Sequence, residues 1–162
     1  LKFNVKNPVN LWQLRMALGG SLILTAGQIF EIPRFMWVGF ACVSLLSEYP
    51  YSSNTLPRFW QRIIGALAGS GLFFIVYQIT PEFFHLLMGP LGGLCLGFCT
   101  YYRYKTAMNC FGALMLATGI YGVHTAVLLR ITDTILGVCF GMIFAVIFHK
   151  LIAKKYLNEE IA

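Results

Sequence analysis

Two arginines and two acidic side chains, set among long apolar stretches, are the residues most able to do chemistry. Arg58 and Arg62 are four residues apart, so they share one face of a helix. A guanidinium pair can hold a carboxylate with paired hydrogen bonds, which predicts capture of an anionic substrate. The alternative is that both arginines anchor the chain to anionic lipid headgroups.

The two acidic candidates each have a functional and a structural interpretation. Asp133 follows Arg130 by three residues, so it is either a proton-coupling carboxylate or half of a local pair on one helix face. Glu48 stands beside Tyr49, near the expected end of a membrane helix. It could titrate during transport or lie in the headgroup layer. Arg130 and Tyr49 are therefore kept as candidate substrate or transport residues.

Signatures of enzymes, metal sites and nucleic-acid binding are missing from the sequence. There is no H-E-x-x-H and no Walker loop, and the glycines lie within apolar stretches where no phosphate would sit. Cys95 and Cys99 are four residues apart, but no His, Asp or Glu lies within one turn of either. We therefore expect no enzymatic activity, no metal and no cofactor.

The composition is that of a membrane protein. The chain has 162 residues, of which 58% are hydrophobic and 11% charged, and its mean hydropathy is +0.72. Soluble domains carry about 25% charged residues. A span needs about 20 residues, and six apolar blocks qualify if the short second one is completed by interfacial residues such as Trp37. These blocks are Leu14–Phe30, Phe35–Leu46, Ile63–Ile79, Phe83–Tyr102, Ala107–Leu129 and Ile131–Ala153. The expected connections include Ser47–Gln61 and Arg103–Thr106.

The distribution of basic residues predicts the orientation. If all six blocks cross, ten of the twelve basic residues fall on one side, and Arg34 and Arg130 alone fall on the other. The ten are Lys2, Lys6, Arg15, Arg58, Arg62, Arg103, Lys105, Lys150, Lys154 and Lys155. The basic side is expected to be cytoplasmic. This predicts a multi-pass protein of the cell (plasma) membrane with both termini in the cytoplasm, and it explains the net charge of +6 without nucleic acid.

An internal repeat predicts two halves. When Arg58 is aligned with Arg130, the glycines that follow each arginine also align, in a shared R-x6-G-x3-G pattern. Three helices in each half, about 14–79 and 83–153 of a single transmembrane domain, would make the second half inverted. We expect an all-α membrane protein of two inverted three-helix repeats, an architecture of many secondary transporters. Small residues four apart predict close helix packing at Gly65, Gly69, Gly93, Gly97, Gly137 and Gly141.

These residues resemble a known family. The block that starts at Phe35-Met-Trp and the later Arg62-Ile-Ile-Gly-Ala-Leu-Ala-Gly segment resemble the fusaric-acid-resistance or aromatic acid exporter superfamily, and so does the Arg130–Gly141 segment. The resemblance covers roughly Leu14 to Lys155. Ala66 stands where the family often has Thr.

The resemblance and the polar residues together predict an inner-membrane exporter, or an exporter subunit. Its substrates would be small amphipathic organic anions such as aromatic carboxylic acids, and the proton gradient would drive it. Expected partners are the organic anion, membrane lipid and further copies of the chain in a homo-oligomer. The alternative is a membrane scaffold or accessory subunit that transports nothing and assembles through small-residue helix interfaces.

Overall fold

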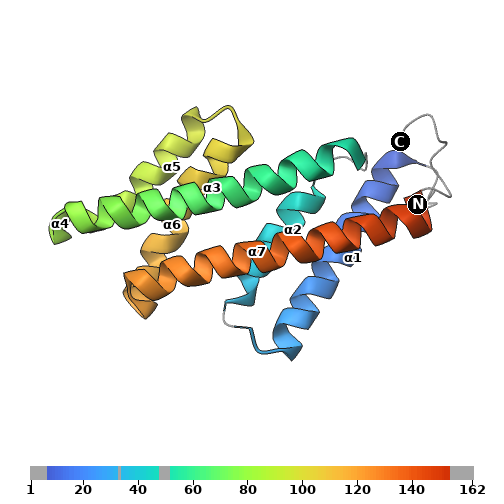
Figure 1. Ribbon diagram of the computed structural model, residues 1–162, viewed down its shortest axis with the longest axis horizontal. Coiled ribbons are helices and arrows are strands. Elements are labelled where there is room, and N and C mark those ends of the chain that lie inside the picture. Colours follow the sequence, from blue (N-terminus) through green and yellow to red (C-terminus); the bar gives the residue numbers. More distant parts are fainter. Residues whose placement is uncertain (1–6, 33, 48–51, 154–162) are drawn as a thin grey trace. The chain divides into compact units, whose positions relative to one another are not determined.

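The computed structural model describes residues 7–32, 34–47 and 52–153, and every regular element in these ranges is helical (Figure 1). The elements are α1 (Pro8–Ile29), α2 (Phe35–Leu46), α3 (Ser52–Ile79), α4 (Glu82–His85), α5 (Met88–Phe98), α6 (Tyr102–Tyr121), α7 (Val123–Phe148) and the π-helix η1 (His149–Ala153). The all-α fold class is therefore confirmed. Helix α1 begins as its sequence directs: the Asn7 side chain caps the Val9 amide at 3.0 Å, and Pro8 occupies a first-turn position that needs no amide hydrogen.

Two predicted connections are wrong in their bounds. The expected loop Ser47–Gln61 is shorter, because α3 already begins at Ser52 and carries Pro57 in its second turn. The expected connection Arg103–Thr106 lies inside α6, and the chain leaves the helical conformation at 99–101 instead. Arginine and lysine have high helix propensities. Arg103 and Lys105 therefore interrupt the apolar run of the sequence without ending the helix.

The boundary between the last two helices is also displaced from its predicted place. Helix α6 ends at Tyr121, and α7 begins at Val123 rather than at Ile131. Gly122 alone joins them, with a φ of 77° that favours glycine. Because glycine is not polar, the apolar run continues through this turn and hides it. Arg130 therefore lies within α7 rather than at the start of a helix.

Two helical segments are long and apolar enough to cross a membrane, among the residues that the structure describes. They are Thr55–Ile79 and Val123–Ile152. Helices α2 and α5 are apolar but have only 12 and 11 residues, fewer than the roughly 20 that a span needs. Trp37, expected at the interface, is instead buried, with the Arg34 guanidinium 4.7 Å from its ring centroid. Six crossings therefore stay a prediction.

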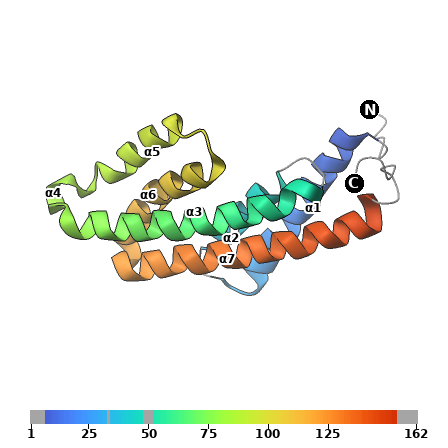
Figure 2. The same cartoon turned by 45° about the horizontal axis from the view of Figure 1, so that its top comes forward.

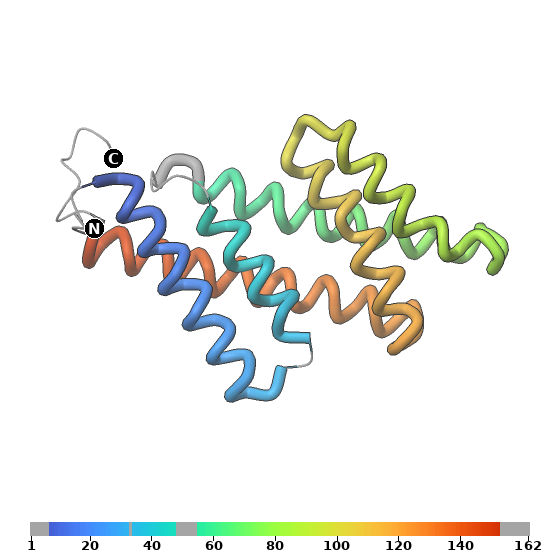
Figure 3. Tube along the Cα trace, turned by 180° about the vertical axis from the view of Figure 1, so that it is seen from behind, coloured from blue at the N-terminus to red at the C-terminus, as the bar shows by residue number. Residues whose placement is uncertain are grey.

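The chain divides into two compact units, and α3 and α7 each contribute to both. The first unit comprises Leu1–Trp60 and Ile135–Ala162. In it, α1 and α2 lie side by side, and the C-terminal part of α7 packs on them (Figure 3). Its core joins these three helices through Ile23, Val38, Cys42, Leu46 and Ala145.

The second unit comprises Gln61–Thr134 and repeats this plan with other helices. Helices α5 and α6 lie side by side, and the C-terminal part of α3 runs along them (Figure 2). Phe73 of α3 is fully buried against Phe111 of α6, with ring centroids 5.5 Å apart in an edge-to-face arrangement. Each unit thus pairs two consecutive helices with a third from the other half of the sequence.

Glycines in α3 let its backbone approach α6 in the second unit. A methyl group added at Gly65 would lie 2.6 Å from the Arg103 carbonyl oxygen and 2.8 Å from Thr106 Cβ. One added at Gly69 would lie 2.6 Å from Ala107 Cα. All three distances are too short for a real side chain. Both glycines thus lie where α3 and α6 approach each other closely.

Glycines in α7 make the corresponding contacts with α2 in the first unit. A methyl group at Gly137 would meet the Val38 carbonyl oxygen and would lie 2.7 Å from Ala41 Cβ. One at Gly141 would lie 3.4 Å from Cys42 Cα. The approach of α7 to α2 is closer at Gly137 than at Gly141.

The two sets of contacts correspond residue by residue, but with a shift in the partner helix. The sequence repeat, which aligns Gly65 with Gly137, would also align Val38 with Cys110. In the structure, however, Gly137 contacts the Val38 carbonyl oxygen and Gly65 contacts that of Arg103, so Val38 corresponds to Arg103. The shift from Cys110 to Arg103 is about two helical turns, so the same face of the second helix is presented in both units. The corresponding partners are Val38 and Arg103, Ala41 and Thr106, and Cys42 and Ala107.

The third predicted glycine pair differs from the other two. Nothing in the described chain lies within 4 Å of a methyl group added at Gly93 or Gly97. The close approach of α5 to α6 falls on Gly92 instead, where a methyl group would lie 2.5 Å from Phe111 Cβ. The intramolecular packing contact thus belongs to the glycine one position earlier, and Gly93 and Gly97 make no such contact with the described residues.

Substitution of two nearby glycines of α3 tests the packing. Gly69→Ala should lower the melting temperature of the purified protein, because overpacking of a tight contact costs about 1–3 kcal/mol. Gly71→Ala is the matched control on the same helix, since no described atom lies within 4 Å of its added methyl group. Alanine should be tolerated there or should stabilise the helix slightly. Equal melting temperatures for the two variants would contradict the contact at Gly69.

Candidate anion-binding site

A cavity of about 350 Å³ in the second unit is the strongest candidate site. Helices α3, α5 and α6 line it, through Arg62, Leu96, Gly97, Tyr102, Lys105, Thr106 and Asn109. Two of these residues are cationic, and none of them is acidic. Small-molecule sites have volumes of about 300–1,000 Å³ and a few converging polar groups, so both the size and the lining suit a small anion.

Arg62 is the central residue of this cavity. Its side chain is only 7% exposed, and one terminal nitrogen donates a long hydrogen bond of 3.4 Å to the Tyr102 hydroxyl. Within the described residues, its Nε makes no hydrogen bond, and neither does the Oγ1 of Thr106, which is 2% exposed. A buried guanidinium with an unused donor is costly to leave without an acceptor. The cavity therefore presents a buried positive charge and hydrogen-bonding groups to a ligand.

The glycine contact positions this arginine. Arg62 and Gly65 are three residues apart and so lie on the same face of α3. Gly65 lets that face approach α6 at Arg103 and Thr106. As a result, the Arg62 side chain reaches the Tyr102 hydroxyl, one turn before Thr106 on α6. The packing motif and the candidate ligand group are thus parts of one arrangement.

Helix α6 supplies the polar wall of the cavity as a single stripe. Tyr102, Lys105, Thr106 and Asn109 have the spacing i, i+3, i+4, i+7 of one helix face. Lys105 and Asn109 are exposed, whereas Thr106 is buried. Sequence analysis missed Tyr102, Lys105 and Thr106 as site residues because it ended the preceding helix at Tyr102 and placed a connection over Arg103–Thr106. The helical spacing of polar residues was the signal that could have found them.

The corresponding positions of the first unit are much less polar. The alignment of Arg103 with Val38 relates the four polar residues of α6 to Trp37, Phe40, Ala41 and Ser44 of α2. The alignment of Gly65 with Gly137 relates Arg62 to Thr134 of α7, which is the last residue assigned to the second unit. The two units share their helix packing but differ in the polarity of this face. The polar stripe is therefore not needed for the packing itself.

Arg58 makes different contacts from Arg62. Its Nε donates to the Ser44 carbonyl oxygen at 3.0 Å, and its Nη2 donates to the Ser47 hydroxyl at 3.2 Å. The two guanidinium groups, which the sequence placed on one helix face, thus have different partners: the end of α2 for Arg58 and α6 for Arg62.

The C-terminal end of α2 receives two further donors. Trp12 Nε1 donates to the Ser47 carbonyl oxygen at 3.1 Å, and Arg15 Nη2 donates to the Leu46 carbonyl oxygen at 2.7 Å. The last carbonyls of a helix have no partner within it and carry its negative dipole end. Side chains of α1, together with Arg58 of α3, satisfy them. Arg58 therefore has a structural contact that stabilises the end of α2.

The remaining predicted residues lie elsewhere or outside the described ranges. Arg130 and Asp133 are each 3% exposed and lie well inside α7. The predicted block Ile131–Ala153 would place Asp133 in the first turn of its helix, which is wrong, since α7 begins ten residues earlier, at Val123. Glu48 and Tyr49 lie outside the residues that the structure describes. The roles predicted for these four residues stay predictions.

No metal site is formed by the part of the chain that the structure describes: no three His, Cys, Asp or Glu side chains come close enough to share an ion.

Comparison with known proteins gives one result. The family model of fusaric acid resistance protein-like proteins matches residues 22–144. No curated protein and no solved structure matches the chain. The family match covers most of the sequence and includes α2, α3, α5 and α6. The chain therefore belongs to the fusaric acid resistance protein-like family, and it is a membrane protein with a transport-related function.

Proposed function

We propose that this chain is an exporter, or a subunit of one, that moves small amphipathic organic anions such as aromatic carboxylic acids out of the cell. The observation that carries this proposal is the buried Arg62 side chain in a cavity of about 350 Å³ whose described lining residues include no acid. Membership of the family supports a transport role. The substrate class rests on the chemistry of the cavity.

The lining suits a carboxylate joined to an apolar body. Arg62 can donate two parallel hydrogen bonds to the carboxylate. The exposed Lys105 adds charge at the rim, and the Asn109 amide offers a further donor. Leu96 and the ring of Tyr102 provide apolar surface for the body of the ligand. Water is partly excluded around the buried Arg62 guanidinium, so its interaction with a carboxylate is stronger than it would be in bulk solvent.

We propose that the proton gradient drives export, with Asp133 as the proton carrier. Its side chain is 3% exposed within α7, and α7 is one of the helices apolar enough to cross a membrane. Acidic side chains inside membrane helices are costly and mark proton relays. Glu48 is the second candidate for this role. A structural pair of Asp133 with Arg130 is the alternative.

We also propose six crossings in two inverted halves, with both termini in the cytoplasm. The corresponding glycine contacts of the two units support a repeated structure. Basic residues assigned to the cytoplasmic side come together within each unit: Arg15 and Lys150 line one cavity, and Arg62 and Lys105 line another. Arg34, assigned to the opposite side, stands at the other end of α2 from the carbonyls that Arg15 and Arg58 contact.

A scaffold or accessory subunit is the second candidate, and one observation favours it. Gly93 and Gly97 are four residues apart, and each faces open space among the described residues. Such a pair allows a helix of another chain to approach closely, which also fits the proposed homo-oligomer. Anion flux through liposomes that contain the purified chain alone would separate an exporter from a scaffold.

The anion site is tested at Arg62. Arg62→Gln should weaken binding of radiolabelled benzoate to the purified protein roughly tenfold to hundredfold, because a hydrogen bond to a charged group contributes about 1.5–3 kcal/mol. Arg62→Lys should restore only part of the affinity, since a point charge cannot make the paired contact. Arg103→Gln removes the same charge from an exposed residue outside the cavity and should bind normally. Unchanged benzoate affinity in a folded Arg62→Gln protein would remove this residue from the site.

Coupling is tested at Asp133. Wild-type flux of labelled benzoate into inside-out vesicles should increase when a pH gradient is imposed. Asp133→Asn should make flux the same with and without the gradient, because the amide cannot carry a proton. Persistence of the gradient effect in this variant would assign Asp133 to a structural pair with Arg130. A wild-type flux that ignores the gradient would contradict proton drive altogether.

Topology is tested with single cysteines in a variant whose five native cysteines have been replaced. In intact cells, a cysteine at Ser53 should be protected from a membrane-impermeant thiol reagent, because the charge distribution places it in the cytoplasm. A cysteine at Glu82, an exposed position at the start of α4, should be labelled. Labelling at position 53 but not at position 82 would show that α2 does not cross.

A further inference from the structure

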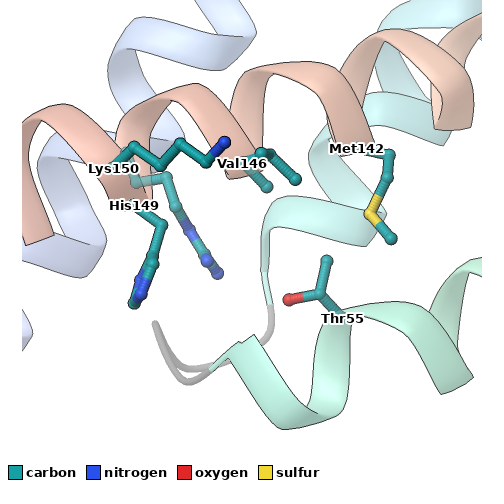
Figure 4. A pocket seen from close by; sticks show the side chains of 7 residues that line it. Thr55, Met142, Val146, His149 and Lys150 are labelled. Carbon is teal, nitrogen blue, oxygen red and sulfur yellow. The ribbon is translucent and has the colours of Figure 1, made fainter. Parts of the chain in front are cut away.

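A second cavity, in the first unit, has a lining that the proposed anion site does not share. It has a volume of about 140 Å³, and side chains of α1, α3, α7 and η1 surround it. Its lining consists of Arg15, Thr55, Met142, Ala145, Val146, His149 and Lys150. Figure 4 shows Thr55 facing α7 across the cavity, with Met142 and Val146 on one stretch of that helix and His149 and Lys150 beyond them.

The polar part of this cavity brings several hydrogen-bond donors together. Arg15 is 4% exposed and Thr55 is 6% exposed, so a guanidinium and a hydroxyl are both held in a buried setting. The Arg15 guanidinium also donates to the Leu46 carbonyl oxygen at 2.7 Å, which fixes its position beside α2. Lys150 and His149 add an ammonium and an imidazole, and none of the described lining residues is acidic. Such a group of donors favours an anion with several oxygens.

The apolar part of the lining distinguishes a lipid from a soluble phosphate. Met142, Ala145 and Val146 form one wall of the cavity. Val146 is 46% exposed, and the neighbouring Ile147 and Leu151 are also exposed. In a membrane protein, exposed aliphatic side chains on a helix that can span the bilayer face acyl chains. The wall of the cavity thus continues into an apolar surface of α7.

The backbone changes at the point where the cationic residues begin. Helix α7 ends at Phe148, and the π-helix η1 starts at His149. Short π-helical segments are rare in proteins, and those that occur are often found at functional sites. Here the π-turn carries the two consecutive residues, His149 and Lys150, that both line the cavity. Residues one position apart on a regular α-helix do not normally face the same direction.

We propose that this cavity binds the phosphate of an anionic phospholipid, whose acyl chains lie along the exposed apolar face of α7. Arg15 and Thr55 hold the phosphate from the buried side, and Lys150 and His149 close over it from η1. The site is separate from the Arg62 cavity, and the proposal does not depend on what that cavity transports. A lipid bound here would join α1, α3 and the end of α7 within the first unit.

Lipid retention by the purified full chain tests this proposal. The protein is exchanged into nanodiscs of phosphatidylcholine with a minor fraction of phosphatidylglycerol, and bound lipid is measured by native mass spectrometry after release. Wild-type protein should retain phosphatidylglycerol over phosphatidylcholine. Lys150→Gln should lower that preference about fivefold, since each basic residue near an anionic surface contributes about 1 kcal/mol.

Controls separate a built site from general surface charge and from free phosphate. Arg103→Gln removes one exposed positive charge outside the cavity and should keep the preference for phosphatidylglycerol. Soluble glycerol 3-phosphate should not raise the melting temperature of wild-type protein, whereas phosphatidylglycerol should raise it. The proposal is overturned by equal retention of both lipids, by an equal loss in Arg103→Gln, or by the same stabilisation from glycerol 3-phosphate. Thr55→Val, which keeps the shape and removes the hydroxyl, provides a second test if Lys150→Gln does not fold.

Discussion

Close approach of helix backbones at glycine is the constraint on which the rest of this structure depends. Inside a bilayer, apolar side chains gain nothing by leaving lipid for protein, so helices associate through van der Waals contact and hydrogen bonds. At Gly65, Gly69 and Gly137, a single added methyl group would meet the backbone of a neighbouring helix. In both units the third helix comes from the other half of the sequence, so these contacts also hold the two halves of the chain together.

The same contact explains why a charge can be buried in the second unit. Gly65 brings α3 against α6, and Arg62, one turn earlier, is carried into a cavity rather than into lipid. A guanidinium in such a setting has lost much of its water and, among the described residues, has gained only a long contact to the Tyr102 hydroxyl. That imbalance favours a ligand that brings its own negative charge. If the chain is an exporter, Arg62 must also release the ligand on the other side of the membrane, and this requirement sets an upper limit on its affinity for the ligand.

The sequence predicts well those features that depend on residue type at fixed spacing. The helical class, the correspondence of Gly65 with Gly137, and the family were all accessible, because glycine and arginine at set intervals carry a direct physical meaning. Helix ends were less accessible. Gly122 ends α6 through its backbone conformation, while hydropathy passes through it unchanged. The polar wall at Tyr102 and Thr106 was missed for a related reason, since a charged residue ends an apolar run without ending the helix that contains it.

The three donors at the end of α2 have a consequence for how the chain is made. Helix α2 has 12 residues and is about 18 Å long, at about 1.5 Å per residue. Its final carbonyls are satisfied by Trp12 and Arg15, which are synthesised before it, and by Arg58, which is synthesised after it. Unsatisfied carbonyls are costly in lipid. When the ribosome has finished synthesising α2, Arg58, the last of these donors, has not yet been synthesised. The contacts at this end of α2 are therefore complete only once the first turns of α3 have left the exit tunnel, so α1, α2 and the start of α3 depend on one another for this part of the fold.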